Sequence, residues 1–210
     1  MAAPVVTEPA IDRVIGHFDL ETTQREIVRA TPGETYDAIW TADLSRTPSA
    51  RALSALALWP ERARAWLRHE PAPPPSSRSA TLRDLLTPDS PWRLLADEPG
   101  AEVVLGLLWT PPAGVVRCAP EAFADCSARG VAKVAWSIAV MPFGAGHALL
   151  VTRTRTHAVD TLARRRLTLL WPLISPFAAL LRIQVLRAIK ATAEMPAREA
   201  PSGRRVPQQA

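Results

Sequence analysis

Residues 27–40 read IVRATPGETYDAIW, and this stretch holds the end of one element and the start of another. It closes an alternating segment, His17 to Arg29, whose β-branched residues are typical of a strand. Thr31 can accept a hydrogen bond from the backbone N–H of Glu34, whose carboxylate can reach back, and Pro32 suits the first helical position. The stretch therefore predicts a strand that passes directly into a helix.

A second helix is predicted immediately downstream. Thr47 and Pro48 repeat the start signal, and apolar residues recur at helical spacing from Ala52 to Leu67. Residues 70–80 follow with four prolines and three serines, a composition that predicts a surface loop and not a domain boundary.

Beyond residue 90 the apolar pattern changes to a period of two, which predicts a run of antiparallel strands. The turn signal Glu98-Pro99-Gly100 joins the first two, and a glycine-containing hairpin loop, residues 142–146, joins the last two. We expect strands at 91–97, 101–109, 131–141 and 147–158, a short one at 114–118, and a turn of helix at 120–125.

The chain then predicts one long helix, capped by Asp160 and ending near Met195, with Pro172 and Pro176 kinking it. Basic residues, Arg182 among them, are expected opposite an apolar stripe made of Leu167, Leu170, Ile174, Phe177, Leu181, Val185 and Ala188. Residues 167–181 carry no charge, but they fall short of the ~20 residues that span a bilayer. A buried helix is the favoured interpretation, and a membrane-surface helix is the alternative.

Composition limits the class of protein. A hydrophobic share of 48%, a charged share of 21% and a mean hydropathy of +0.02 exclude a mostly disordered chain, a collagen-like fibre and a polytopic membrane protein. The net charge of +5 is concentrated in the last third, but one tyrosine and four phenylalanines give little aromatic surface for stacking bases, so no nucleic-acid partner is expected. Cys118 and Cys126 have neither a zinc-site spacing nor a disulfide framework, and the N-terminus lacks a signal-peptide pattern, which predicts a cytoplasmic protein.

The order of strand, two helices, antiparallel strands and long terminal helix resembles the START-like SRPBCC superfamily, which includes polyketide cyclase-like proteins and pollen-allergen relatives. Residues 27–40 resemble its opening, and the hairpin from Trp136 to Arg155 followed by the last helix resembles its closing half. The resemblance implies an α+β helix-grip fold, with a curved antiparallel sheet of six or seven strands wrapped around the C-terminal helix. We expect one domain over residues 17–195, with disordered tails at 1–16 and 196–210.

A helix-grip fold implies an apolar cavity between sheet and helix, because one helix cannot completely fill a strongly curved sheet. The expected function is therefore binding of a hydrophobic or amphipathic small molecule, such as a lipid, an isoprenoid or a polyketide-like compound. Two alternatives stay open. One is a cyclase- or dehydratase-like enzyme that uses the same cavity, and the other is a structural or membrane-surface protein that acts through the last helix.

The sequence contains no serine-nucleophile elbow, metal-ligand spacing or phosphate loop, so no catalytic residue, metal or cofactor is predicted. On the strand at 147–158, either Arg153 and Arg155 or the threonines between them face the cavity, and alternation alone leaves that choice open. No stable membrane insertion is expected, peripheral membrane contact is left open, and no oligomeric state is assigned. The candidate ligand-binding residues are Tyr36, Trp109, Trp136, Arg153, Thr154, Arg155, Ile174, Phe177 and Leu181.

Overall fold

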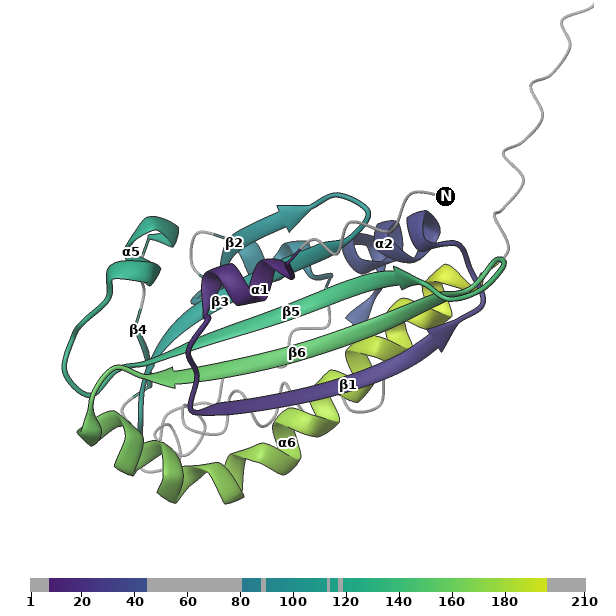
Figure 1. Cartoon of the computed structure of the whole chain (residues 1–210). Coiled ribbons are helices and arrows are strands. Elements are labelled where there is room, and N and C mark those ends of the chain that lie inside the picture. The colour runs from purple at the N-terminus through teal and green to yellow at the C-terminus, as the bar shows by residue number, and fades with distance from the viewer. Residues whose placement is uncertain (1–7, 45–80, 88–89, 113, 117–118, 196–210) are drawn as a thin grey trace, which may run out of the picture.

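The computed structural model describes residues 8–44, 81–87, 90–112, 114–116 and 119–195 (Figure 1). The predicted second helix, the proline-rich loop and the C-terminal tail lie outside these residues. The described elements, in chain order, are α1 (Ala10–Val14), β1 (Leu20–Val28), α2 (Pro32–Thr41), a 3-10 turn (Arg83–Leu86), β2 (Arg93–Glu98), β3 (Glu102–Thr110), β4 (Gly114–Val116), α5 (Pro120–Asp125), β5 (Ala132–Pro142), β6 (Ala148–Ala158) and α6 (Thr161–Ala193).

These elements form the expected helix-grip fold. Six antiparallel strands make one sheet in the order β1-β6-β5-β3-β2, with β4 paired to β3. The long helix α6 follows β6 directly and crosses one face of the sheet (Figure 1). Each described strand lies within a few residues of its predicted position, because hydrophobic alternation and turn residues define strands locally.

Different helices pack against the two faces of the sheet. We call the face that packs against α2 and α6 the inner face, and its buried cluster includes Tyr36, Trp136, Ile138, Leu186 and Ile189. We call the opposite side the outer face, and it packs against α1 and α5 through a second cluster that includes Ile11, Ile15, Val104, Phe123 and Ala135. Side chains paired across neighbouring strands share a face, so the register assigns each strand residue to one of these two sides.

The predicted start of α2 is confirmed. The backbone N–H of Glu34 donates to the Thr31 hydroxyl at 3.3 Å, and the Glu34 carboxylate accepts from the backbone N–H of Thr31 at 2.9 Å. These bonds to Thr31 hold the pKa of Glu34 below its usual value. The capping box sets the direction of α2 and turns Tyr36 and Ile39 toward the inner face, where both are buried.

The prediction of a disordered tail over residues 1–16 is wrong for residues 10–15. Residues 10–14 form α1, and Ile11 and Ile15 are buried in the outer cluster. The helix has only five residues and no side-chain cap, so it leaves no periodicity to read. Contacts distant in sequence stabilise it instead, among them a bond of 2.6 Å from the Ala10 N–H to the buried carboxylate of Glu102.

Helix α6 begins and ends close to its predicted limits. Its first turn is capped by Asp160, whose carboxylate accepts from the backbone N–H of Ala163 at 2.7 Å. Pro172 and Pro176 lie inside the helix, and Figure 1 shows that α6 changes direction along its length. The expectation that Arg182 lies on the polar side is wrong, because this side chain is 5% exposed.

Candidate functional site

Helix α6 packs firmly against the rest of the molecule only near its two ends. Ala163 and Leu167 are buried at the N-terminal end, and Val185, Leu186 and Ile189 are buried at the C-terminal end. From residue 168 to residue 181 no side chain is buried. The sheet-facing residues of this middle segment are half-buried: Leu170, Trp171, Ile174, Ser175, Ala178 and Ala179.

The inner face near this middle segment combines aromatic, aliphatic and hydroxyl side chains. The Gln24 amide on β1 donates to the backbone oxygen of Ala179 at 3.4 Å, which fixes the alignment of β1 with α6. Thr22, two residues earlier on β1, pairs in register with Thr154 of β6, which pairs with Trp136 of β5. Thr22 and Thr154 are half-buried, so this part of the inner face lacks the full burial found toward the C-terminal end of α6.

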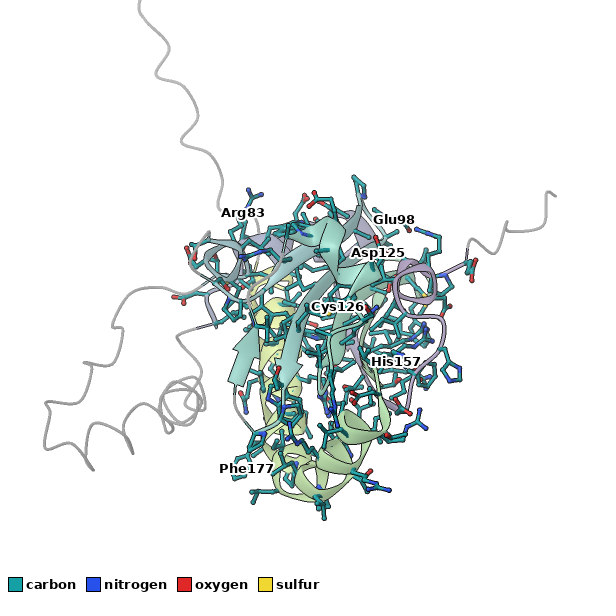
Figure 2. The ribbon with its side chains drawn as sticks, turned by 90° about the vertical axis from the view of Figure 1, so that its left-hand side faces the viewer. Arg83, Glu98, Asp125, Cys126, His157 and Phe177 are labelled. Carbon is teal, nitrogen blue, oxygen red and sulfur yellow. The ribbon has the colours of Figure 1, made fainter. Side chains whose placement is uncertain are left out.

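Three of the predicted ligand-binding residues lie on the inner face or on the side of α6 that faces it. Trp109 and Thr154 are half-buried on the inner face, and Ile174 lies on the sheet-facing stripe of α6. Phe177 and Leu181 lie on the flank of the helix, 42% and 37% exposed. Figure 2 shows Phe177 near the margin of the molecule, at the opposite end from Arg83.

Trp136 belongs to the packed part of the inner face. Its indole N–H donates to the Thr152 hydroxyl at 2.6 Å, and that hydroxyl donates to the backbone oxygen of Ser137 at 2.9 Å. Its ring packs edge-on against Trp92, with 5.7 Å between ring centroids. These contacts satisfy the one polar group of the side chain, so Trp136 offers no free donor.

Tyr36 also has a partner within the protein. Its hydroxyl donates to the carboxylate of Asp97 on β2, and burial together with this carboxylate raises the pKa of Tyr36 to about 12. The ring is 7% exposed and packs in the inner cluster. The contact anchors α2 to the edge strand β2.

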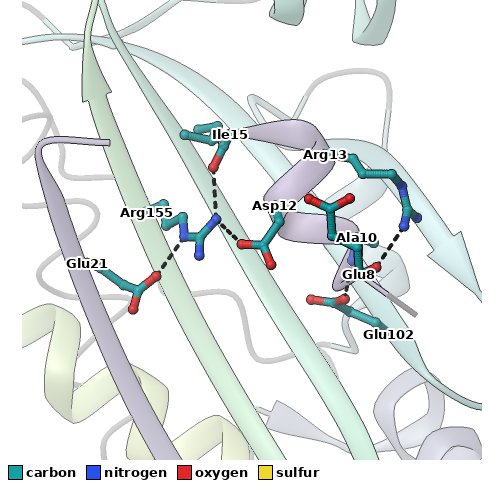
Figure 3. A network of polar contacts seen from close by, with 8 residues as sticks. All are labelled: Glu8, Ala10, Asp12, Arg13, Ile15, Glu21, Glu102 and Arg155. Carbon is teal, nitrogen blue, oxygen red and sulfur yellow. Dashed lines mark hydrogen bonds and ion pairs between the residues drawn. The ribbon is translucent and has the colours of Figure 1, made fainter. Parts of the chain in front are cut away.

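Arg155 lies on the outer face, so of the two alternatives left open for this strand, the one that places Arg155 in the cavity is wrong. Its guanidinium forms an ion pair with Asp12 of α1, a bond of 2.6 Å to Glu21 of β1 and a bond of 2.9 Å to the backbone oxygen of Ile15 (Figure 3). It also lies 4.4 Å above the ring of Phe18. Arg155 therefore holds α1 against the outer face of the sheet.

The choice between the two sides of β6 is therefore decided. Arg153 shares the outer face with Arg155, because strand residues two apart point to the same side. Thr152, Thr154 and Thr156 face inward. Figure 2 shows His157, which is also on the outer parity, on the same side of the sheet as α1.

Arg182 is the functional candidate that the sequence pattern missed. It is buried on the sheet-facing side of α6, and its Nε has no hydrogen-bond partner among the described residues. Two further buried atoms without a partner in the described ranges, the Thr22 hydroxyl and the Gln24 amide oxygen, lie on the inner face of β1. A sequence motif could not have identified them, because they belong to two elements that lie far apart in the sequence.

The outer surface of α6 has separate features. Leu169, Leu173 and Leu180 are 80%, 66% and 52% exposed, on the side away from the sheet. A hollow of about 540 Å³ lies beside the first turns of α6, lined by Thr161, Arg164, Arg165, Thr168 and Leu169. This hollow is on the outside of the helix and is distinct from the predicted cavity.

Helix α6 is long and apolar enough to cross a membrane by length and composition. Its most apolar window of 18 residues has a mean hydropathy of 1.6, and 17% of that window is buried. One such helix is weak evidence for a membrane span, because helices of other kinds pass the same test. Within the described residues, no group of three or more histidine, cysteine, aspartate or glutamate side chains could hold a metal ion.

No protein-family model matches the chain, and no curated protein matches its sequence. Three solved structures illustrate the similarity of fold. Truncated norcoclaurine synthase from Thalictrum flavum is 14% identical, with 84% of this chain and 94% of that chain covered and a TM-score of 0.34. Zhui aromatase/cyclase from Streptomyces sp. R1128 is 11% identical, with coverage of 88% and 99% and a TM-score of 0.33. Hypothetical protein jhp0584 from Helicobacter pylori is 11% identical, with coverage of 92% and 99% and a TM-score of 0.37.

The helix-grip fold is defined by the element order and the sheet topology of this chain. At these identities and TM-scores the solved structures say nothing further about function. The function has to come from the residues of this chain.

Proposed function

We propose that this helix-grip chain binds a hydrophobic or amphipathic small molecule, such as a lipid, an isoprenoid or a polyketide-like compound, between the inner face and the middle of α6. The observation that carries the proposal is the burial pattern of α6, which is packed near both ends and has no buried residue from 168 to 181. A helix that packed on a sheet along its whole length would bury a side chain every three or four residues. The interruption marks the length over which a ligand would replace protein contacts.

The chemistry of the surrounding side chains supports the same proposal. Trp109 and Ile174 offer apolar surface, and Thr154 offers a hydroxyl that can orient a ligand. Small-molecule sites typically combine a mostly apolar lining with a few polar groups. Fourteen helical residues span roughly 20 Å, about the length of an extended medium-chain or long-chain acyl group.

The direct test is displacement of a fluorescent apolar probe, N-phenyl-1-naphthylamine, by laurate, 1-dodecanol, farnesol and anthraquinone. At least one of the four is expected to displace the probe and to raise the melting temperature, because a ligand that binds the native state stabilises it. Absence of displacement and of any thermal shift with all four compounds would contradict the proposal.

A matched pair of variants locates the binding. Ala178→Trp places an indole on the sheet-facing side of α6, whereas Leu173→Trp places one at a position that is 66% exposed. We expect Ala178→Trp to weaken ligand binding at least tenfold without lowering the melting temperature of the unliganded protein, and Leu173→Trp to leave binding unchanged. If Ala178→Trp instead destabilises by the roughly 1–3 kcal/mol typical of an overpacked core, protein already fills the space.

A second candidate function is reversible attachment to a membrane surface. Leu169 and Leu173 are the two most exposed large apolar side chains of the described residues, and Arg164 and Arg165 lie one turn before Leu169. Apolar side chains beside arginines suit the interface of an anionic bilayer. Flotation with vesicles of phosphatidylcholine, with and without phosphatidylserine, tests this, and the double variant Leu169→Gln/Leu173→Gln should abolish any flotation.

Catalysis is not part of the proposal. Among the described residues, Tyr36 is bonded to Asp97, His147 lies in the exposed β5–β6 hairpin and His157 lies on the outer face. These groups do not bring an acid and a base together beneath the middle of α6. The cytoplasmic location stays a prediction from the sequence.

A further inference from the structure

Arg182 has an unusual environment for an arginine. It is 5% exposed, and no acceptor in the described part of the chain contacts it. It lies one helical turn before Leu186 and two before Ile189, which both pack in the inner cluster. Its side chain is therefore directed toward the sheet at the point where the packed end of α6 gives way to the unpacked middle.

One polar side chain of β1 contacts this part of α6, and a second lies two residues away on the same face of the strand. The Gln24 amide N–H contacts the backbone oxygen of Ala179, three residues before Arg182. Thr22 is on the same face of β1 as Gln24 and two residues closer to the N-terminal end of the strand. We call Thr22, Gln24 and Arg182 the β1–α6 seam.

Buried polar atoms without a hydrogen-bond partner are frequent in the seam. Six buried side-chain nitrogen or oxygen atoms lack a hydrogen-bond partner within the described residues, and three of the six belong to the seam: the Thr22 hydroxyl, the Gln24 amide oxygen and Arg182 Nε. Buried polar atoms are nearly always paired in native proteins, so each exception needs an explanation. Three such atoms along one seam are open to hydrogen bonds from a ligand or from water.

The charge on Arg182 sets the chemistry of that ligand. Burial lowers the pKa of its guanidinium, and no neighbouring acid opposes the effect. Arginine nevertheless keeps its proton at neutral pH, so the side chain remains a cation whose buried Nε has no hydrogen-bond partner among the described residues. Such a cation is costly unless it is paired and hydrogen-bonded, and an anionic ligand would supply both.

We infer that the β1–α6 seam binds the carboxylate of an amphipathic acid whose apolar tail lies beneath the middle of α6. The inference rests on the proposed function and narrows it to acids. The planar fork of Arg182 can donate to both oxygens of a carboxylate, and the Thr22 hydroxyl can donate as well. The amide oxygen of Gln24 then accepts from a ligand hydroxyl or a bridging water.

Charge balance favours a carboxylate over a phosphate. The seam contains one cation, which one negative charge neutralises. A phosphate monoester carries nearly two negative charges at neutral pH and would leave one of them buried and uncompensated. The acid is therefore expected to be a monoanion.

The experiment compares laurate with 1-dodecanol, two ligands with the same chain length and different head groups, in the displacement assay at pH 7.5. The wild-type chain should bind laurate at least tenfold more tightly than 1-dodecanol. Arg182→Met should erase that preference while keeping the affinity for 1-dodecanol within about threefold. Arg187→Met, an exposed position five residues further along α6, should leave the preference intact and so control for the overall positive charge of the chain.

The possible outcomes separate the acid-binding inference from the proposed function. Equal affinities for laurate and 1-dodecanol in the wild type overturn the acid-binding inference and leave the proposed function standing, whereas no displacement by any compound removes both. Dodecyl phosphate binding more tightly than laurate overturns the assignment to a carboxylate. If Arg182→Met does not fold, Thr22→Val is the second variant, because it removes one hydrogen-bond donor at nearly constant volume. It is expected to reduce the preference for laurate over 1-dodecanol several-fold. An unchanged preference in Thr22→Val would contradict carboxylate binding at the seam.

Discussion

Arg155 and Arg182 are both buried, at 8% and 5% exposure, on opposite sides of one sheet, and their surroundings differ completely. Arg155 is bonded to Glu21, to Asp12 and to a backbone oxygen, whereas Arg182 contacts no acceptor among the described residues. Burial alone would lower the pKa of either group. At Arg155 the two carboxylates more than reverse that effect, and at Arg182 nothing does.

The difference teaches that burial of a charge does not by itself reveal its role. An arginine whose partners come from the same chain completes the structure, and Arg155 does so by fixing α1 to the outer face (Figure 3). An arginine without partners leaves an electrostatic requirement that a ligand can meet. The buried guanidinium of the outer face therefore has its partners within the chain, whereas on the inner face α6 buries side chains only near its two ends.

The largest expected effect is the loss of stability in Arg155→Met. The variant leaves Asp12 and Glu21 without their cation and releases α1 from the sheet. Breaking a buried ion pair typically costs 3–5 kcal/mol, and the partial exposure of both acids reduces the expected loss to about 2–3 kcal/mol. Urea unfolding measures it, with Arg153→Met, half-buried on the same strand, as the matched control within about 0.5 kcal/mol of wild type. Equal losses in the two variants would remove the special role of Arg155.

Replacing Arg182 is expected to raise the free energy of unfolding, whereas replacing Arg155 lowers it. Arg182→Met replaces an unpaired buried cation with an apolar side chain of similar length, so the unliganded protein should gain roughly 1 kcal/mol of stability. The same unfolding measurement in the absence of ligand checks this. A loss of more than 1 kcal/mol would mean that Arg182 already has a partner within the protein, and the contrast with Arg155 would disappear.

A smaller effect is expected at the packed end of the inner face, where Tyr36→Phe removes the bond to Asp97. The cost should be about 1 kcal/mol, the usual contribution of one hydrogen bond. Ligand binding should not change, because Tyr36 packs in the inner cluster against the C-terminal end of α6. Altered laurate affinity in this variant would extend the binding region beyond the middle of the helix.

The same residue offers a pH test, since it is the single tyrosine of the chain. Its pKa is raised from the ordinary tyrosine value of 10.0 to about 12 in the folded state, so the folded protein holds the phenolic proton more tightly than the unfolded one. The resulting stabilisation is complete below pH 10 and is lost as the pH rises toward 12. Tyrosinate absorbance near 295 nm should show ionisation well above pH 10 in the native protein and near pH 10 in urea. Coincident titrations would show that Tyr36 is not buried as described.

The sequence predicted those parts of the fold that depend on neighbouring residues. The capping box at Thr31 and the hairpin between β5 and β6 rely on contacts only a few residues apart, and both formed as expected. Helix α1 was missed because its stability comes from Glu102 and Arg155, about 90 and 140 residues away. Local patterns contain no information on such contacts.

The candidate site was harder to predict for two physical reasons. Alternation on β6 divides its residues between two sides, but only the positions of Asp12 and Glu21 show that the arginines face outward. Arg182 was placed on the polar side because a charged residue in an amphipathic helix normally faces water. Its burial becomes visible only when α6, with two internal prolines, is packed against β1.

The most direct measurement is a crystal structure of the full chain with bound laurate. We expect the hydrocarbon tail between the inner face and residues 168–181 of α6, with the carboxylate oxygens about 3 Å from the nitrogens of Arg182. An inner face filled with the protein's own side chains, or laurate bound on the outer face, would contradict it.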